Sequence, residues 1–77
     1  MLSRMTNDDD RAWDATNLRA MIDARGVKMR WLADQMGVNQ GTITRWTRGR
    51  TEPGVSDLLR LANLLHCKVR DILPKGA

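Results

Sequence analysis

The 77-residue sequence predicts an all-α domain of five short helices. Apolar residues recur at intervals of three and four after residue 13, and no alternating strand pattern competes with them. Glycine or proline follows most of these segments, at points where a helix must stop. Leu, Met and Trp supply the bulky side chains while Phe and Tyr are absent, which favours helices over strands.

The chain divides at its first apolar period. Residues 1–13 show no such period, so we expect a flexible N-terminal tail there and a domain over residues 14–77. The first helix is predicted from Asp14 to Arg25, with Gly26 at the position where it stops. Trp13 extends this helix backwards if it joins the same apolar face.

Two short helices follow in quick succession. The second is predicted from Met29 to Met36, and Gly37 ends it. Asn39 has the short polar side chain that caps a helix start, which predicts a third helix from Gln40 to about Arg48.

The fourth helix has the clearest apolar stripe, which consists of Val55, Leu58, Leu61, Ala62 and Leu65. A fifth helix is predicted from Val69 to Leu73, ahead of Pro74.

The second and third segments share a spacing with a structural meaning. Two helices joined by a three-residue turn cross closely, so they need a small residue at the crossing and a permissive residue at the turn. Ala33 is small, and Gly37 can adopt the left-handed conformation that begins the turn, which costs a larger residue about 1–2 kcal/mol. The positions that fit this corner are Leu32, Ala33, Met36, Gly37, Val38, Ile43 and Trp46.

These residues resemble a known family. The stretch LADQMGVNQGTITRWTRGRTEPGVSDLLRLANLL is similar to the helix-turn-helix domain of the phage repressor and Cro-like proteins, often called the Xre family. The similarity runs from about Leu18 to Leu73. It implies a compact five-helix lambda-repressor-like domain whose third helix enters the major groove of DNA while the preceding helix lies across the backbone.

The resemblance also implies which residues contact DNA. The first, second and sixth positions of the third helix read bases in such proteins, and here these are Gln40, Gly41 and Arg45, with Thr44 beside them. Gln can pair with adenine and Arg with guanine in bidentate fashion. The expected phosphate contacts are Lys28, Arg30, Asn39, Thr42, Arg48, Arg50 and Thr51.

The sequence departs from the family pattern at the start of the second helix. The family usually has a Ser or Thr cap and a phosphate-binding Gln, where this chain has Lys28 and Met29. Trp31 occupies a position that is commonly polar. We expect it either to pack near Trp13 or to mark a contact surface for a protein partner.

Charge agrees with a polyanionic partner. The net charge is +4, eleven of the 13 basic side chains follow residue 13, and no acid lies between Asp34 and Glu52. The run Asp8 to Asp10 is expected to be solvated.

We find no nucleophile–base pair, no paired carboxylates and no phosphate-binding glycine loop in the sequence, so we expect no enzymatic activity and no cofactor.

His66 and Cys67 are too few for a zinc site, so structural roles are expected for both. The lone cysteine and the lack of a signal peptide or membrane-spanning run favour the cytoplasm of a bacterial or phage-infected cell, where the protein would associate with the nucleoid.

Two functions remain open at this point. The first is a sequence-specific double-stranded DNA-binding transcriptional regulator of the repressor type that acts as a homodimer. The second is an antitoxin or anti-repressor type of interaction module whose DNA binding is secondary. Candidate dimer residues are Leu59, Leu64, Val69 and Ile72, because the fourth helix has more leucines than one buried stripe needs.

Overall fold

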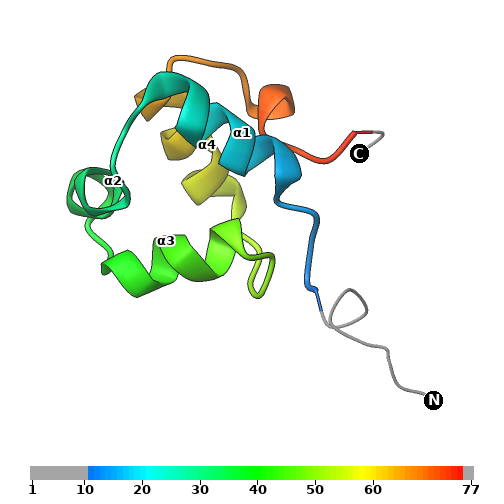
Figure 1. Ribbon diagram of the computed structural model, residues 1–77, viewed down its shortest axis with the longest axis horizontal. Helices are drawn as coiled ribbons and strands as arrows, with labels where there is room; N and C mark the ends of the chain where they lie inside the picture. Colours follow the sequence, from blue (N-terminus) through cyan, green and yellow to red (C-terminus); the bar gives the residue numbers. More distant parts are fainter. Residues whose placement is uncertain (1–10, 76–77) are drawn as a thin grey trace.

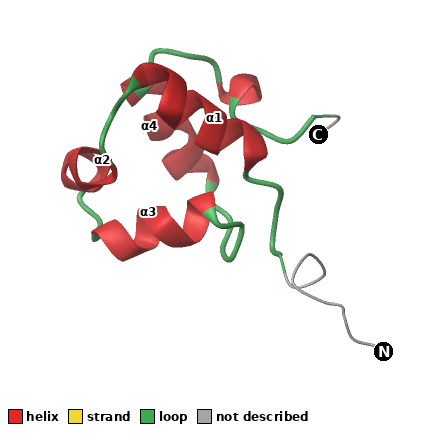
Figure 2. Cartoon of the chain, in the orientation of Figure 1, coloured by secondary structure: helices red, strands yellow, loops and turns green. Residues whose placement is uncertain are grey.

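A computed structural model describes residues 11–75. It contains the helices α1 (Thr16–Arg25), α2 (Met29–Met36), α3 (Gln40–Thr47) and α4 (Val55–Leu64), followed by the short 3-10 helix η2 (Val69–Asp71) (Figure 1). The described residues form no strand (Figure 2). The all-α prediction is therefore confirmed.

The prediction of five α-helices is wrong at the C-terminal end. The segment predicted as a helix from Val69 to Leu73 forms only a three-residue 3-10 turn. Its start is closed by the carboxylate of Asp71, which accepts a hydrogen bond from the backbone N–H of Lys68 at 2.9 Å. Pro74 follows directly. Because proline has no backbone N–H, it cannot add the next hydrogen bond of a helix, and the segment stays short.

The first helix begins two residues later than predicted, at Thr16. The carboxylate of Asp14 accepts hydrogen bonds from both the backbone N–H and the hydroxyl of Thr16, at 2.9 and 2.6 Å. This local bonding holds Asp14 outside the helix, as short polar side chains commonly do at helix starts.

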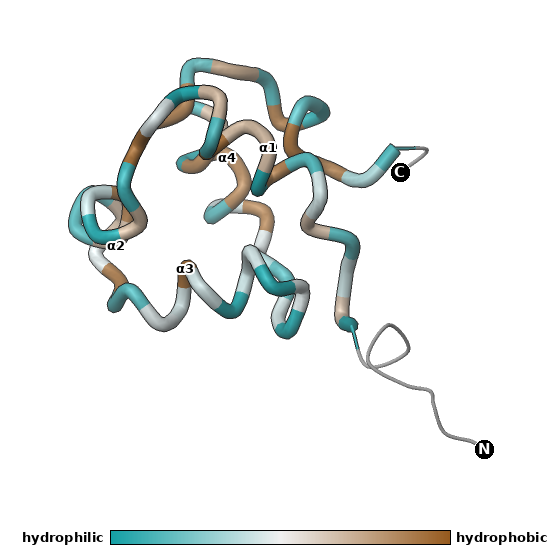
Figure 3. Tube along the Cα trace, in the orientation of Figure 1, coloured by the Kyte–Doolittle hydropathy of each residue, from teal (hydrophilic) through white to brown (hydrophobic). Residues whose placement is uncertain are grey.

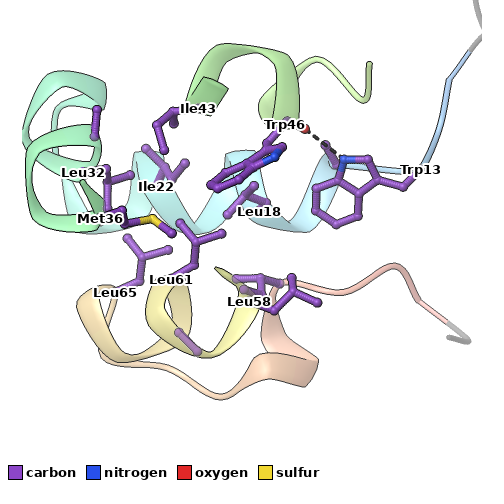
Figure 4. Close-up of a cluster of buried hydrophobic side chains, with 14 residues drawn as sticks. Trp13, Leu18, Ile22, Leu32, Met36, Ile43, Trp46, Leu58, Leu61 and Leu65 are labelled. Atoms are coloured by element: carbon purple, nitrogen blue, oxygen red, sulfur yellow. Dashed lines mark hydrogen bonds between the residues drawn. The ribbon is translucent and has the colours of Figure 1, made fainter. Parts of the chain in front are cut away.

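One apolar core joins all four helices (Figure 4). Its fully buried members are Leu18, Leu32, Ile43, Leu61, Leu65 and Ile72.

Val55 was predicted on the buried stripe of α4, but its side chain is 76 % exposed. It is the first residue of α4, and the buried stripe begins one turn later, at Leu58.

The segment before α1 packs onto the domain. Trp13 is only 8 % exposed, and its indole N–H donates a hydrogen bond of 3.0 Å to the carbonyl of Trp46 in α3 (Figure 4). The backbone N–H of Ala12 donates to the carbonyl of Gly49 at 2.7 Å. Residues 11–13, which the sequence assigned to the tail, thus lie against the end of α3, while residues 1–10 of that expected tail lie outside the described residues.

Three side chains fasten the helix ends to one another. The guanidinium of Arg25 donates to the carbonyls of Leu65 and His66 at the end of α4, at 2.7 and 3.2 Å. Arg60 donates to the carbonyl of Met36 at the end of α2 at 3.3 Å, and Asn17 to that of Leu73 at 2.7 Å. Met36 is the last residue of α2 and Leu65 is the C-cap of α4, where carbonyls have no intrahelical partner, so the arginine side chains satisfy groups that would otherwise bond only to water.

Candidate nucleic-acid interface

A tight corner holds α3 against α2. Gly37 adopts φ +70°, the left-handed conformation that its position predicted. The next N–H, of Val38, returns to the carbonyl of Ala33 at 3.0 Å, and Ala33 is buried where the two helices meet. Because both features are met by the predicted residues, the helix-turn-helix spacing is confirmed.

The start of α3 is fixed by Asn39. Its side-chain oxygen accepts hydrogen bonds from the backbone N–H and the hydroxyl of Thr42, at 3.0 and 3.2 Å. The predicted N-cap is thus confirmed. The same hydroxyl accepts a hydrogen bond of 3.3 Å from the guanidinium of Arg45, so a chain of contacts links Arg45 back to the cap.

The outer face of α3 is polar and accessible. Gln40, Gly41 and Arg45 are exposed and Thr44 is half-buried, whereas Ile43 and Trp46 point into the core. Hydrophilic and neutral residues run along most of the helix (Figure 3). A helix that buries only one narrow stripe leaves its remaining surface available to a ligand.

Gly41 has a role that the sequence did not reveal. A Cβ atom at this position would lie 3.3 Å from the side-chain oxygen of Asn39 and 3.5 Å from a terminal nitrogen of Arg45. The missing side chain therefore spares the capping oxygen of Asn39 a tight contact that would move it by a few tenths of an ångström. The contact of such a Cβ atom with Arg45 would be an ordinary one.

Lys28 and Arg30 lie near the start of α3. Both line a groove of about 570 Å³ with Gln40, and the other lining residues are Ile22, Asp23, Val27 and Met29. Lys28 makes no side-chain cap to α2, as the departure from the family pattern predicted. Two residues predicted to contact phosphates, Lys28 and Arg30, thus lie in the same groove as Gln40, which is predicted to read a base.

The remaining predicted phosphate contacts surround the same helix. Asn39 precedes α3 and is exposed, and Thr42 within it is half-buried. Arg48, Arg50 and Thr51 are exposed in the segment that follows. The backbone N–H of Arg50 donates to the carbonyl of Arg45 at 2.9 Å, which keeps this segment close to the end of α3.

The proposed contact surfaces for proteins need two corrections. Trp13 is buried against α3 and cannot contact a partner, whereas Trp31 is 41 % exposed on α2. Ile72 is fully buried within the single chain, which removes it from the candidate dimer surface. Leu59 is 58 % exposed, and Leu64 and Val69 are half-buried against the core.

His66 and Cys67 lie at the end of α4. His66 has φ +55°, in the left-handed region where a glycine often ends a helix. The thiol of Cys67 is half-buried against the core, and this burial raises its pKa above the ordinary value.

No cluster of three or more potential metal ligands occurs among residues 11–75. None of the described helices is long and apolar enough to cross a membrane.

Comparisons with known proteins place this geometry in a family. The sequence profile of the helix-turn-helix family matches residues 2–72, so the chain belongs to that family. No curated protein sequence matches the chain significantly.

Two solved structures are similar to the chain over most of its length. One is the DNA-binding domain of the P22 C2 repressor, with 28 % identity and a TM-score of 0.70 over 75 % of this chain and 76 % of that one. The other is the clp gene regulator ClgR from C. glutamicum, with 29 % identity and a TM-score of 0.69 over 75 % of each chain. The fold is therefore that of a repressor-like helix-turn-helix domain.

Proposed function

We propose that the chain is a sequence-specific double-stranded DNA-binding transcriptional regulator of the repressor type. The observation that carries this proposal is the accessible polar face of α3, which has Gln40 and Arg45 exposed and carries no acid. The major groove of B-DNA admits one α-helix and presents a distinct donor and acceptor pattern for each base pair. The printed descriptions of the two similar structures, a repressor domain and a gene regulator, support the same class.

Gln40 and Arg45 are the proposed base-reading side chains. Gln40 stands at the first position of α3 and can pair with adenine, while Arg45 suits the two acceptors of guanine. Among the described residues, the guanidinium of Arg45 donates only to the hydroxyl of the half-buried Thr42, at 3.3 Å, and this long hydrogen bond is easily exchanged for one to a base. Thr44 lies beside them, but its hydroxyl already donates to the carbonyl of Gln40 at 3.1 Å, so its methyl group is the part that meets a thymine.

The basic residues at both ends of α3 set the position of the helix on DNA. Lys28 and Arg30 reach one backbone from the groove beside Gln40, and Arg48 and Arg50 reach phosphates beyond the other end of α3. The polar side chains of Asn39, Thr42 and Thr51 complete this set. Such contacts carry no sequence information, but they make affinity depend steeply on salt.

A homodimer follows from the length of the reading helix. One eight-residue α3 covers only a few base pairs, so specific binding requires two copies on a near-palindrome with half-sites about 34 Å apart. Leu59 is exposed on α4 one turn from the exposed Val55, and Leu64 and Val69 follow at the far end. We assign the second copy to this surface. Such a regulator acts in the cytoplasm, on the DNA of a bacterial or phage-infected cell.

The test compares two variants that each lose one positive charge. The wild-type protein is first used to select a duplex from a random library, and affinity for that duplex is measured between 50 and 200 mM salt. With four basic contacts from each copy, or about eight per dimer, affinity should fall roughly 10⁴-fold over this range. Arg45→Ala should lose ~1–3 kcal/mol of binding to the selected duplex and less to a scrambled one.

The control variant is Lys68→Ala. Lys68 is exposed next to η2, which contacts α1 and α4 and lies across the molecule from α3 (Figure 1). It should therefore bind the selected duplex almost as the wild type does. Affinity that is independent of salt, or equal losses in the two variants, would contradict the proposal.

Trp31 supports a second candidate function. A tryptophan that is 41 % exposed on a small domain is uncommon and favours contact with a protein. In this alternative the chain is an antitoxin or anti-repressor type of interaction module, and DNA binding is secondary. The alternative holds if Arg45→Ala and Gln40→Ala leave DNA binding unchanged while Trp31→Ala abolishes binding to a purified partner.

A further inference from the structure

The backbone that follows α3 is held between that helix and the segment of residues 11–13. The carbonyl of Trp46 accepts two hydrogen bonds, one of 3.1 Å from the backbone N–H of Gly49 and one of 3.0 Å from the indole N–H of Trp13 (Figure 4). The carbonyl of Gly49 in turn accepts a bond of 2.7 Å from the backbone N–H of Ala12. Both backbone groups of Gly49 are therefore bonded, one to α3 and the other to the N-terminal segment.

The N-terminal segment and Gly49 are in close contact. Gly49 is buried and has φ +75°, and a Cβ atom there would lie 2.8 Å from the carbonyl oxygen of Trp13. Because Cβ atoms essentially never come so near, only glycine allows the two backbones to pack at this separation. The ring of Trp13 is itself buried in the apolar core. A core side chain thus anchors the segment, in addition to its two hydrogen bonds.

Gly49 lies between two arginines that are predicted to contact phosphates. Arg48 is the C-cap of α3 and Arg50 follows the glycine, and both are exposed. Their backbone N–H groups return to the carbonyls of Thr44 and Arg45, at 3.0 and 2.9 Å. Among the described residues, neither guanidinium makes a hydrogen bond or an ion pair. The position of each charge therefore depends on the backbone that carries it.

We propose that Trp13 is a positioning residue for the DNA interface. Its indole N–H and buried ring hold the backbone of residues 48–50 against α3, from where Arg48 and Arg50 reach phosphates beyond the end of the helix. Trp13 acts through these arginines and does not itself contact DNA. A cation that is already held in place binds a phosphate more tightly, because less conformational freedom is lost on binding. This inference rests on the proposed function, which supplies the two phosphate contacts.

The test compares Trp13→Phe with Asn17→Ala. The first variant keeps an aromatic ring and loses the indole N–H, whereas the second loses the hydrogen bond to the carbonyl of Leu73. Each removes one bond between a side chain and a backbone carbonyl, so the Tm should fall by about 4–8 °C in both. Asn17→Ala therefore controls for a loss of stability that removes no bond to α3.

The first readout is amide hydrogen exchange in the free protein, followed by NMR. Three amide protons report on the backbone that Trp13 supports, those of Ala12, Gly49 and Arg50. Each should exchange several-fold faster in Trp13→Phe than in Asn17→Ala, at a temperature where both variants are folded by circular dichroism.

The second readout is binding to one selected duplex as a function of salt. Loss of both phosphate contacts would make the slope of log K against log salt less steep by up to ~1.8 per copy, at ~0.9 per phosphate. Trp13→Phe should move toward this limit, and Asn17→Ala should keep the wild-type slope. The base preference assigned to Arg45 should remain in both. In a protein that already carries Arg48→Ala and Arg50→Ala, Trp13→Phe should cause no further change, because no cation is left to position.

A second variant reaches the same backbone without altering the core. Ala12→Pro removes the N–H that bonds to Gly49, and it should reproduce both changes even if Trp13→Phe does not fold. The proposal is overturned if the folded variants bind the duplex as Asn17→Ala does, whatever their exchange rates. A wild type that binds no duplex would reject the proposed function and this inference with it. Wild-type binding that the variants leave unchanged would reject the inference alone.

Discussion

The contact between the N-terminal segment and the end of α3 can be tested by adding one methyl group. Gly49 has φ +75°, and its Cβ would approach the carbonyl oxygen of Trp13 to 2.8 Å. In Gly49→Ala the left-handed conformation alone costs ~1–2 kcal/mol. The clash also forces the segment away, which weakens the hydrogen bonds of Ala12 and Trp13, worth ~0.5–1.5 kcal/mol each. The expected loss is therefore about 2–5 kcal/mol.

Gly26→Ala is the matched control. Gly26 has φ +68°, but a Cβ there would meet no atom within 4 Å, so only the conformational cost of ~1–2 kcal/mol applies. A domain of this size has roughly 4–12 kcal/mol of stability, so both variants should remain measurable by urea unfolding. Tryptophan fluorescence and far-ultraviolet circular dichroism report the two transitions. If Gly49→Ala loses no more stability than Gly26→Ala, residues 11–13 are not packed as described.

Three further predictions concern the helix ends. His66→Gly should raise the free energy of unfolding in urea by about 0.5–1 kcal/mol. Glycine removes the steric cost of the left-handed conformation, and this gain exceeds the conformational entropy that glycine adds to the unfolded chain. A lower free energy of unfolding would contradict this prediction. Asn39→Ala should cost ~1 kcal/mol through loss of the cap to Thr42, and Asn39→Asp should retain most of it. Hydrogen bonds from Thr16 lower the pKa of Asp14, so the stability that this carboxylate contributes is present above its ordinary pKa and is lost as the pH falls through the lowered value. NMR titration should show that pKa rising in Thr16→Ala, and an unchanged value would refute the assignment.

Local signals were sufficient for the central part of the domain. The second helix has the predicted bounds Met29–Met36, and the third begins at Gln40 after the predicted cap. Gly37 adopts the predicted left-handed turn. Each of these depends on residues within a few positions of one another, where capping, glycine conformation and apolar spacing act directly.

The wrong expectations for Trp13 and Ile72 arose where distant residues decide the structure. Trp13 has no apolar partner at helical spacing, and its hydrogen-bond partner Trp46 is 33 positions away, so its burial could not be read from local pattern. Ile72 was named for the dimer surface together with the surplus leucines of the fourth helix, without any local signal of its own burial. In the structure, the 3-10 turn brings it wholly into the core.

The small cavity at the end of α3, which Arg11, Arg19 and Arg48 help to line, shows the same limit. Arg11, Arg19 and Arg48 come from three separate segments, and only the packed fold brings them together. The predicted base-reading residues, in contrast, belong to one helix, and the helical period alone places them on one face.

The claim that α3 reads the major groove is tested most directly by repeating the random-duplex selection with Arg45→Ala. The wild type should select two half-sites with centres about 34 Å apart, or about one helical turn. Arg45→Ala should keep this spacing but lose its preference at one base pair in each half-site. An unchanged selection profile, or an equal loss of preference at every position, would contradict the reading role of α3.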